Sequence, residues 1–141
     1  MASAQDPGGA RAETRLFNLV DARLRAQHDM TLGELDFLRV LGRRPTCRVQ
    51  DVAGEIDITV GATSKAVDRL EAKGWCRRKA NPDDRRSSLL VLTPAGRRAL
   101  AAATPTFEAA MAEHVADLPQ PILDHLAEGL RLWRRHLEGR D

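Results

Sequence analysis

The chain has 141 residues, of which 43% are hydrophobic and 4% aromatic, and its formal net charge is +2. This length suffices for one domain with a buried core, and no run of about 18 apolar residues predicts a membrane-spanning helix. Two cysteines do not make a disulfide framework, and the first nine residues lack the apolar segment of a signal peptide. We therefore expect a cytoplasmic protein without a membrane partner.

The first third of the chain predicts two helices after a disordered tail at residues 1–9, which are small and polar. Large apolar residues recur every four positions from about residue 10 to residue 27, as in an amphipathic helix. Thr31 and Glu34 have the spacing of a capping box, so a second helix is expected to begin there. This helix should end near residue 42.

The middle of the chain predicts two short helices joined by a tight turn. Residues 46–48 are expected to add a small strand to a sheet edge, and residues 49–56 have helical apolar spacing. Asp57 lies in the turn, where aspartate tolerates the left-handed conformation better than most residues. Thr59 is then the predicted N-cap of a helix over residues 60–73.

The helix over residues 60–73 divides into an inward and an outward face. The inward positions, three and four residues apart, are Thr63, Ala66, Val67 and Leu70. The outward positions are Gly61, Ser64, Lys65 and Asp68. A face with small residues and one lysine near its N-terminus suits a helix that enters a DNA major groove.

Residues 75–79 and residues 89–92 are predicted to be the two strands of a β-hairpin with four charged residues at its tip. Thr93 and Pro94 are typical of a helix start, and a long helix should follow to about residue 116. A last amphipathic helix follows a proline-rich break. The fold class is therefore mainly α with a small β-hairpin wing, that is, a winged helix-turn-helix with flanking helices.

Charge is distributed unevenly along the chain. Residues 43–98 hold thirteen Lys and Arg against seven Asp and Glu, whereas the two ends together hold nine against thirteen. A basic centre between acidic ends is what a phosphate-binding segment requires, although an ordinary solvated surface remains the alternative.

The hairpin carries a resemblance to a known family. The segment Asp84-Arg85-Arg86-Ser87-Ser88-Leu89-Leu90-Val91-Leu92-Thr93 resembles the wing signature of the MarR family of bacterial transcriptional regulators. Residues 67–74 resemble the end of that family's recognition helix, and residues 93–96 resemble the start of the helix after its wing. The resemblance extends over residues 10 to 138, although the terminal helices match only in position and amphipathicity.

The resemblance implies a homodimeric regulator without enzymatic activity. The helices over residues 10–30 and 100–141 would form a dimerisation lobe, and residues 31–99 a winged helix-turn-helix DNA-binding domain. Two such units would bind double-stranded DNA at a pseudo-palindromic operator, most often as a repressor, and a small anionic aromatic effector would release it. Its pocket is unassigned; Arg15 and His28 are candidates for a carboxylate contact, and surface placement is the alternative for both.

The candidate DNA-binding residues lie in the recognition helix and the wing. They are Thr59, Gly61, Ser64, Lys65, Arg69, Asp84, Arg85 and Arg86. By resemblance, Arg86 enters a minor groove while Asp84 pairs with it or orients it. Asp57 replaces the glycine common in the family's turn, and the start of the recognition helix is poor in hydroxyl and basic groups, which bears on base preference rather than fold.

Other functions have weaker support. Cys47 and Cys76 fit buried packing better than oxidant sensing, because the reactive cysteine of related proteins lies in the first helix. The four histidines are scattered, so no metal site is predicted, and we expect no cofactor. No glycine-rich phosphate loop or nucleophile elbow indicates an enzyme. A non-specific architectural DNA-binding or interaction module with the winged fold is the alternative function.

Overall fold

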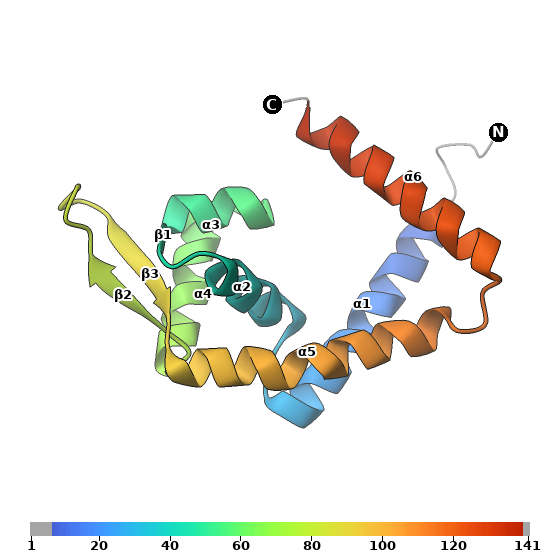
Figure 1. Ribbon diagram of the computed structural model, residues 1–141, viewed down its shortest axis with the longest axis horizontal. Coiled ribbons are helices and arrows are strands. Elements are labelled where there is room, and N and C mark those ends of the chain that lie inside the picture. Colours follow the sequence, from blue (N-terminus) through green and yellow to red (C-terminus); the bar gives the residue numbers. More distant parts are fainter. Residues whose placement is uncertain (1–6, 140–141) are drawn as a thin grey trace.

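The described residues form six helices and a small sheet (Figure 1). The computed structural model describes the backbone of residues 7–139 and the side chains of residues 11–139. The helices are α1 (Pro7–His28), α2 (Leu32–Arg43), α3 (Val49–Ile56), α4 (Val60–Ala72), α5 (Pro94–Val115) and α6 (Gln120–Glu138). The strands are β1 (Cys47–Arg48), β2 (Cys76–Ala80) and β3 (Ser88–Leu92). The predicted class, mainly α with a small wing, is confirmed.

Helix α1 starts three residues before the predicted position. Residues 7–9 belong to its first turn, whereas residues 1–6 of the predicted tail lie outside the described residues, as do residues 140 and 141. The other helix ends lie within one or two residues of their predicted positions.

Three threonines cap helices as their sequence context predicts. Thr31 and Glu34 form the reciprocal capping box of α2, with both hydrogen bonds present. Thr59 Oγ1 accepts the amide of Ala62 at the start of α4, and Thr93 Oγ1 accepts the amide of Gly96 at the start of α5. Each threonine thereby satisfies an amide that has no partner inside its helix.

Two residues with positive φ end the helices of the helix-turn-helix. Asp57 has φ 59° and closes α3 through its own amide, which donates to the carbonyl of Ala53. Gly74 has φ 71° and ends the turn after α4. Aspartate therefore occupies the left-handed position predicted for it, where glycine is the easier residue.

The sheet is antiparallel in the order β1-β3-β2, so β3 lies between the two other strands. Cys47 faces Leu90 across one ladder, and Arg78 faces the same leucine across the other. The two-residue strand β1 confirms the small edge strand predicted for residues 46–48 and ties the start of α3 to the wing.

The core lies where helices α1 to α5 and the sheet meet. Its largest fully buried apolar side chains are Leu24, Met30, Leu35, Leu38, Leu70, Leu90, Val20, Val52 and Val67. Gly96 permits the close approach of α5 to the sheet, because a Cβ there would lie 1.9 Å from the carbonyl oxygen of Trp75. The winged unit, meaning residues 31–99, thus shares with α1 a core that is formed within one chain.

The N-terminal part of α1, the C-terminal part of α5 and the whole of α6 extend away from this core. Helix α1 packs along α5, and α6 turns back after residue 119 and stands apart from the winged unit (Figure 1). No residue of α6 is buried. Among the described residues, no helix is long and apolar enough to cross a membrane.

Candidate nucleic-acid interface

Helix α4 presents one face to the core and leaves the other free, as its spacing predicts. Thr63, Val67 and Leu70 are fully buried, and Thr63 Oγ1 donates to the carbonyl of Thr59 at 2.9 Å. Lys65 lies on the exposed side. Packing therefore accounts for Thr63, and the free face is the part of α4 available to a ligand.

The N-terminal turn of α4 is open to close approach by a large partner. A Cβ added to Gly61 would meet no atom within 4 Å. Val60 is 51% exposed although it is apolar, and Ser64 is half-buried on the same side. A small, accessible helix start of this kind fits the wide major groove of B-DNA.

The wing tip is held by its own hydrogen bonds. Asn81 Nδ2 donates to Ser87 Oγ at 2.8 Å, and Asn81 Oδ1 accepts the amide of Asp83 at 3.0 Å. Asp84 Oδ1 accepts the backbone amide of Arg86 at 2.9 Å. These bonds order the loop and leave the guanidinium groups of Arg85 and Arg86 exposed.

Asp84 acts on the backbone of Arg86 in this structure. Among the described residues, no ion pair joins the two side chains. Of the two alternatives from the sequence, the orienting contact is therefore the one present. The Arg86 guanidinium remains available to an external anion.

A hollow of about 230 Å³ lies between α4, the start of α3 and the wing. It is lined by Arg48, Val49, Gln50, Val60, Ser64, Arg78, Arg86, Ser87 and Ser88. Guanidinium, amide and hydroxyl donors converge there, which is the donor set that a phosphate group requires. The structure thus brings Ser64 and Arg86 together, while Arg69 lies outside this lining near the end of α4.

Sequence reasoning missed two arginines of this hollow. Arg48 donates to Asp51 Oδ1 at 3.1 Å, and its backbone amide donates to the same carboxylate. Arg78 on β2 donates to Asp68 at 2.8 Å and also to Glu71, both on α4. Helical periodicity gives no signal for either residue, because only the sheet pairing brings these strands against α4.

Arg78 joins the wing to the recognition helix. Besides its two ion pairs, its backbone amide donates to Glu71 Oε1 at 2.7 Å, so strand and side chain are both bound to α4. Its charge is largely compensated by these carboxylates. We therefore assign Arg78 to fixing the wing angle. Lys65, Arg85 and Arg86 are exposed basic groups, and Arg48 is exposed but paired with Asp51.

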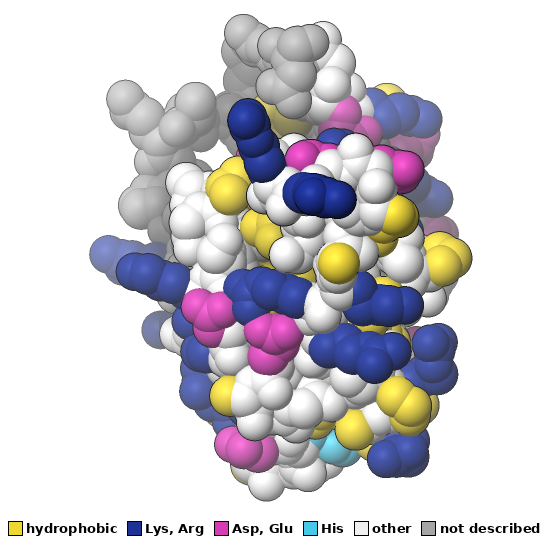
Figure 2. Space-filling view, turned by 90° about the vertical axis from the view of Figure 1, so that its left-hand side faces the viewer, with side chains coloured by type: hydrophobic (Ala, Val, Ile, Leu, Met, Phe, Trp, Pro, Cys, Tyr) yellow, Lys and Arg dark blue, Asp and Glu magenta, His cyan; other side chains and the backbone are white. Residues whose placement is uncertain are grey.

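Basic side chains predominate on the face of the molecule that carries the wing. Figure 2 shows Lys and Arg groups gathered across the middle of this face, with a smaller number of acidic side chains beside them. Such a field attracts a polyanion and raises its association rate.

Neither cysteine is placed for oxidant sensing. Cys47 and Cys76 are buried on the two outer strands, with β3 between them. Burial, reinforced by a neighbouring carboxylate, raises the pKa of both thiols, that of Cys76 to about 11. A protonated, buried thiol is a poor nucleophile, which agrees with a packing role. Within the described residues, no group of His, Cys, Asp and Glu is suited to hold a metal ion.

Comparison with known proteins agrees with this architecture. Residues 30–88 match the MarR family. The chain is 29% identical over 93 residues to the uncharacterized HTH-type transcriptional regulator YwhA of Bacillus subtilis (strain 168), an alignment that covers 66% of this chain and 58% of that protein. The match thus spans less than two thirds of this relative's length.

Solved structures match over most of the chain. Sco3205, a MarR family transcriptional regulator from Streptomyces coelicolor in complex with DNA, has a TM-score of 0.84 and 29% identity, covering 92% of this chain and 82% of that one. The transcriptional repressor CouR, bound to a 23-mer DNA duplex, has a TM-score of 0.81 and 27% identity, covering 89% and 88%. With its capped helix-turn-helix, its wing and its flanking helices, this protein has the architecture of the MarR family of winged helix-turn-helix transcriptional regulators, and its residues 30–88 match that family.

Proposed function

We propose that the protein is a sequence-specific DNA-binding transcriptional regulator that acts as a homodimer in the cytoplasm. The observation that carries the proposal is the common surface formed by the free face of α4, the hollow beside it and the exposed wing arginines. Both solved relatives described above were crystallised with DNA, which supports a duplex as the ligand of this surface.

Helix α4 is proposed to enter the major groove with its N-terminal turn. Gly61 permits close approach, Ser64 and Lys65 contact base edges or phosphates, and the exposed Val60 suits a thymine methyl group. Thr59 holds the helix start and Arg69 contacts a phosphate one turn further on. Removing any one of these phosphate contacts should reduce the slope of the salt dependence of binding by about one.

The wing is proposed to reach the adjacent minor groove. Arg86, with Arg85 beside it, provides the exposed guanidinium groups, and Asp84 holds the loop that presents them. A narrow minor groove has a strongly negative potential that favours inserted arginine. The wing would therefore recognise groove shape rather than base edges.

A second copy of the chain is the proposed partner of α6. Apolar residues form a stripe along this helix, each about half exposed or more: Ile122, Leu126, Leu130, Trp133 and Leu137. A stripe of this length on a soluble monomer would be unusual, and pairing two copies would bury it. We propose residues 10–30 and 100–141 as the dimerisation lobe and residues 31–99 as the DNA-binding domain.

Repression with release by a small effector is the finer part of the proposal. A mainly apolar hollow of about 280 Å³ lies between α1, α2 and α5, and Glu13 and Asp36 are among its lining residues. Their carboxylates would repel the anionic aromatic effector expected by resemblance. We propose that a compound bound here carries a neutral or cationic group, and that an anionic effector needs another site.

The alternative is a non-specific architectural DNA-binding or interaction module with the same fold. The modest set of base-reading side chains on α4 favours it, since Ser64 and Lys65 are the polar groups near its start. Such a module would bind random and selected duplexes with a specificity ratio near one at physiological salt.

Selection of bound fragments from random duplex DNA separates the two functions. A regulator should enrich a pseudo-palindrome whose half-sites lie about ten base pairs apart, one turn of the double helix. Binding without enrichment would support the architectural module, and no binding at any salt concentration would contradict both. Lys65→Ala in the same assay should lower the salt slope by about one.

A further inference from the structure

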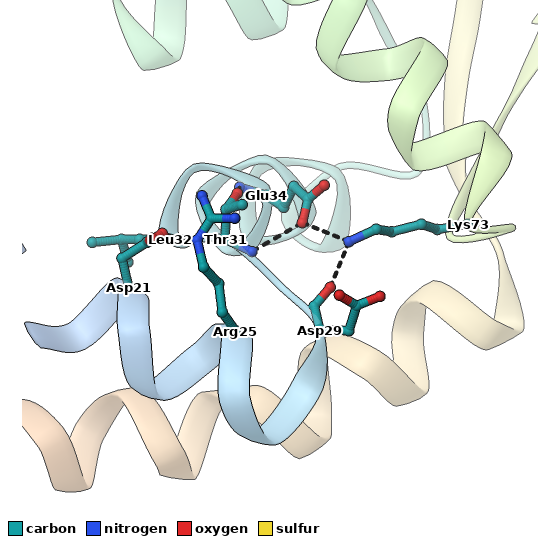
Figure 3. A network of polar contacts seen from close by, with 7 residues as sticks. All are labelled: Asp21, Arg25, Asp29, Thr31, Leu32, Glu34 and Lys73. Carbon is teal, nitrogen blue, oxygen red and sulfur yellow. Dashed lines mark hydrogen bonds and ion pairs between the residues drawn. The ribbon is translucent and has the colours of Figure 1, made fainter. Parts of the chain in front are cut away.

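A lysine at the end of the recognition helix forms a polar contact with the corner between α1 and α2. Lys73, the C-cap of α4, donates to Glu34 Oε2 at 2.9 Å and to the backbone carbonyl of Asp29. Its ammonium group also lies 4.6 Å from the centroid of the Trp75 ring. Figure 3 shows the side chain reaching from α4 between these two acceptors.

The carboxylate of Glu34 is buried and therefore needs a charged or hydrogen-bonding partner. Its side chain is 7% exposed, and the oxygen that meets Lys73 also accepts the amide of Thr31 at 2.9 Å. A buried carboxylate is stable only when paired and hydrogen-bonded. The ion pair is therefore set between two rigid groups, the first turn of α2 and the last turn of α4.

Asp29, whose carbonyl accepts the hydrogen bond from Lys73, has an uncommon backbone conformation. Its φ is 49°, and the chain reverses there, with the amides of Asp29 and Met30 donating back to Arg25 and Leu24 of α1. This left-handed end of α1 turns the Asp29 carbonyl outward, where Lys73 binds it.

The same corner is bound to the body of α1. Asp21 Oδ1 accepts the amide of Leu32, the first residue of α2, at 2.7 Å, and Asp21 Oδ2 accepts from Arg25 at 2.6 Å (Figure 3). A continuous set of polar contacts thus runs from the middle of α1, through the corner, to the end of α4.

We infer that the Lys73–Glu34 clamp, meaning Lys73 with Glu34 and the Asp29 carbonyl, positions the recognition helix relative to α1. The inference rests on the proposed DNA-binding function of α4. Lys73 is a positioning residue in this scheme, because its ammonium group is taken up by Glu34, Asp29 and Trp75 rather than presented with Lys65.

The length of α4 converts a small tilt at the clamp into a larger displacement of its first turn. Thirteen residues give α4 a length of about 20 Å, and the clamp holds the end opposite to the one proposed to enter DNA. A tilt of about 5° at the clamped end would move the first turn by roughly 2 Å over that length. Such a movement in both copies changes the spacing between the two recognition helices.

The test uses two variants of the full-length protein. One carries Lys73→Met alone, and the other carries both Lys73→Met and Glu34→Gln. The double variant leaves no unpaired buried charge, and its glutamine still accepts the Thr31 amide, so the fold is retained if the single variant is unstable. Each variant is titrated against the duplex enriched by the wild type and against duplexes with one or two base pairs inserted between the half-sites. We expect about tenfold weaker binding to the enriched duplex and a reduced preference for its spacing.

Two controls separate positioning from direct contact. Arg77→Met removes one positive charge from an exposed position on β2 and should preserve the spacing preference, and Lys73→Arg should restore part of it. The salt slope should remain that of the wild type. A slope reduced by about one would identify Lys73 as a phosphate contact and overturn the inference, as would an unchanged spacing preference.

A measurement without DNA tests the clamp independently of the proposed function. Spin labels at Lys65→Cys on α4 and Ala26→Cys on α1 report the distance between these helices, with labelled chains diluted by unlabelled ones. The buried Cys47 and Cys76 stay in place. We expect a narrow distribution that broadens or shifts in the double variant, and an unchanged distribution would overturn the clamp. If the wild type enriches no duplex, the proposed function fails and this distance alone decides the clamp.

Discussion

The winged unit and helix α6 use apolar residues in opposite ways. In the winged unit, Leu70 of α4 and Leu90 of β3 are fully buried within one chain. In α6, Leu126 and Trp133 are 51% and 63% exposed, and no residue is buried. Since both regions have amphipathic patterns, the difference teaches that a helical stripe predicts a buried face but not whether its partner lies in the same chain.

The same contrast holds for polar contacts. The winged unit joins its elements through ion pairs between different elements, such as Arg78 with Glu71 and Lys73 with Glu34. The ion pair described for α6, Arg134 with Glu138, lies within one turn of the same helix. Interactions that fix an angle between elements are thus found where the proposed DNA-binding surface needs a fixed shape.

Charging the α6 stripe should have the largest effect. Leu126→Glu with Trp133→Glu should give a monomer, since each carboxylate would be buried without a partner in the proposed dimer. Because the two half-sites would then bind independently, affinity for the selected duplex should fall by about a hundredfold or more. Sedimentation would report the monomer, and circular dichroism the intact winged unit. Glu128→Lys, beside Asp124 and Arg131 on the polar side of α6, is the control and should remain dimeric.

Two leucine-to-alanine substitutions test whether a leucine is buried within one chain or between two chains. Leu70→Ala should lower the free energy of unfolding by about 2–5 kcal/mol at every protein concentration. The loss of unfolding free energy in Leu126→Ala should instead depend on protein concentration. The reason is that this leucine would stabilise the fold only through the dimer, and the dimer population depends on concentration by mass action. Denaturant titration at several concentrations measures both. Equal, concentration-independent losses would show that α6 packs within its own chain.

Removing the wing arginine should affect DNA binding alone. Arg86→Ala should weaken binding to the selected duplex by about 1–3 kcal/mol while the dimer and its thermal unfolding stay unchanged, because the side chain is exposed. Electrophoretic mobility shift measures the affinity. Arg97→Ala, an exposed arginine at the start of α5, is the matched control, and an equal loss in both variants would indicate a general charge effect.

The buried thiols should produce the smallest effect, confined to alkaline pH. The pKa of Cys76 is raised from its ordinary value of 9.0 to about 11, so the folded state holds the proton more tightly than the unfolded chain. The resulting stabilisation is fully present below pH 9 and is lost as pH rises through about 11. Stability measured across this range should decline less steeply in Cys76→Ala than in the wild type. An oxidant at neutral pH should leave DNA binding unchanged.

Local signals in the sequence were sufficient for most of the helix ends and turns. Thr31, Thr59 and Thr93 cap helices because their hydroxyls bond amides three residues away, and such contacts depend on few neighbours. The fully buried side of α4 likewise follows from spacing alone. The positions of Arg48 and Arg78 beside Ser64 did not follow, since they depend on strand register and on the approach of the wing to α4.

What the sequence determined by itself is therefore the set of elements, their caps, their buried faces and the charged wing, because each depends on residues within a few positions of one another. What only the tertiary structure decided is which polar groups meet. The Lys73–Glu34 clamp joins residues 39 positions apart, and the Arg78 contacts span 7 to 14 positions between helix and strand. Such pairings depend on how whole elements pack, because an ion pair or hydrogen bond forms only when both groups arrive within about 3 Å.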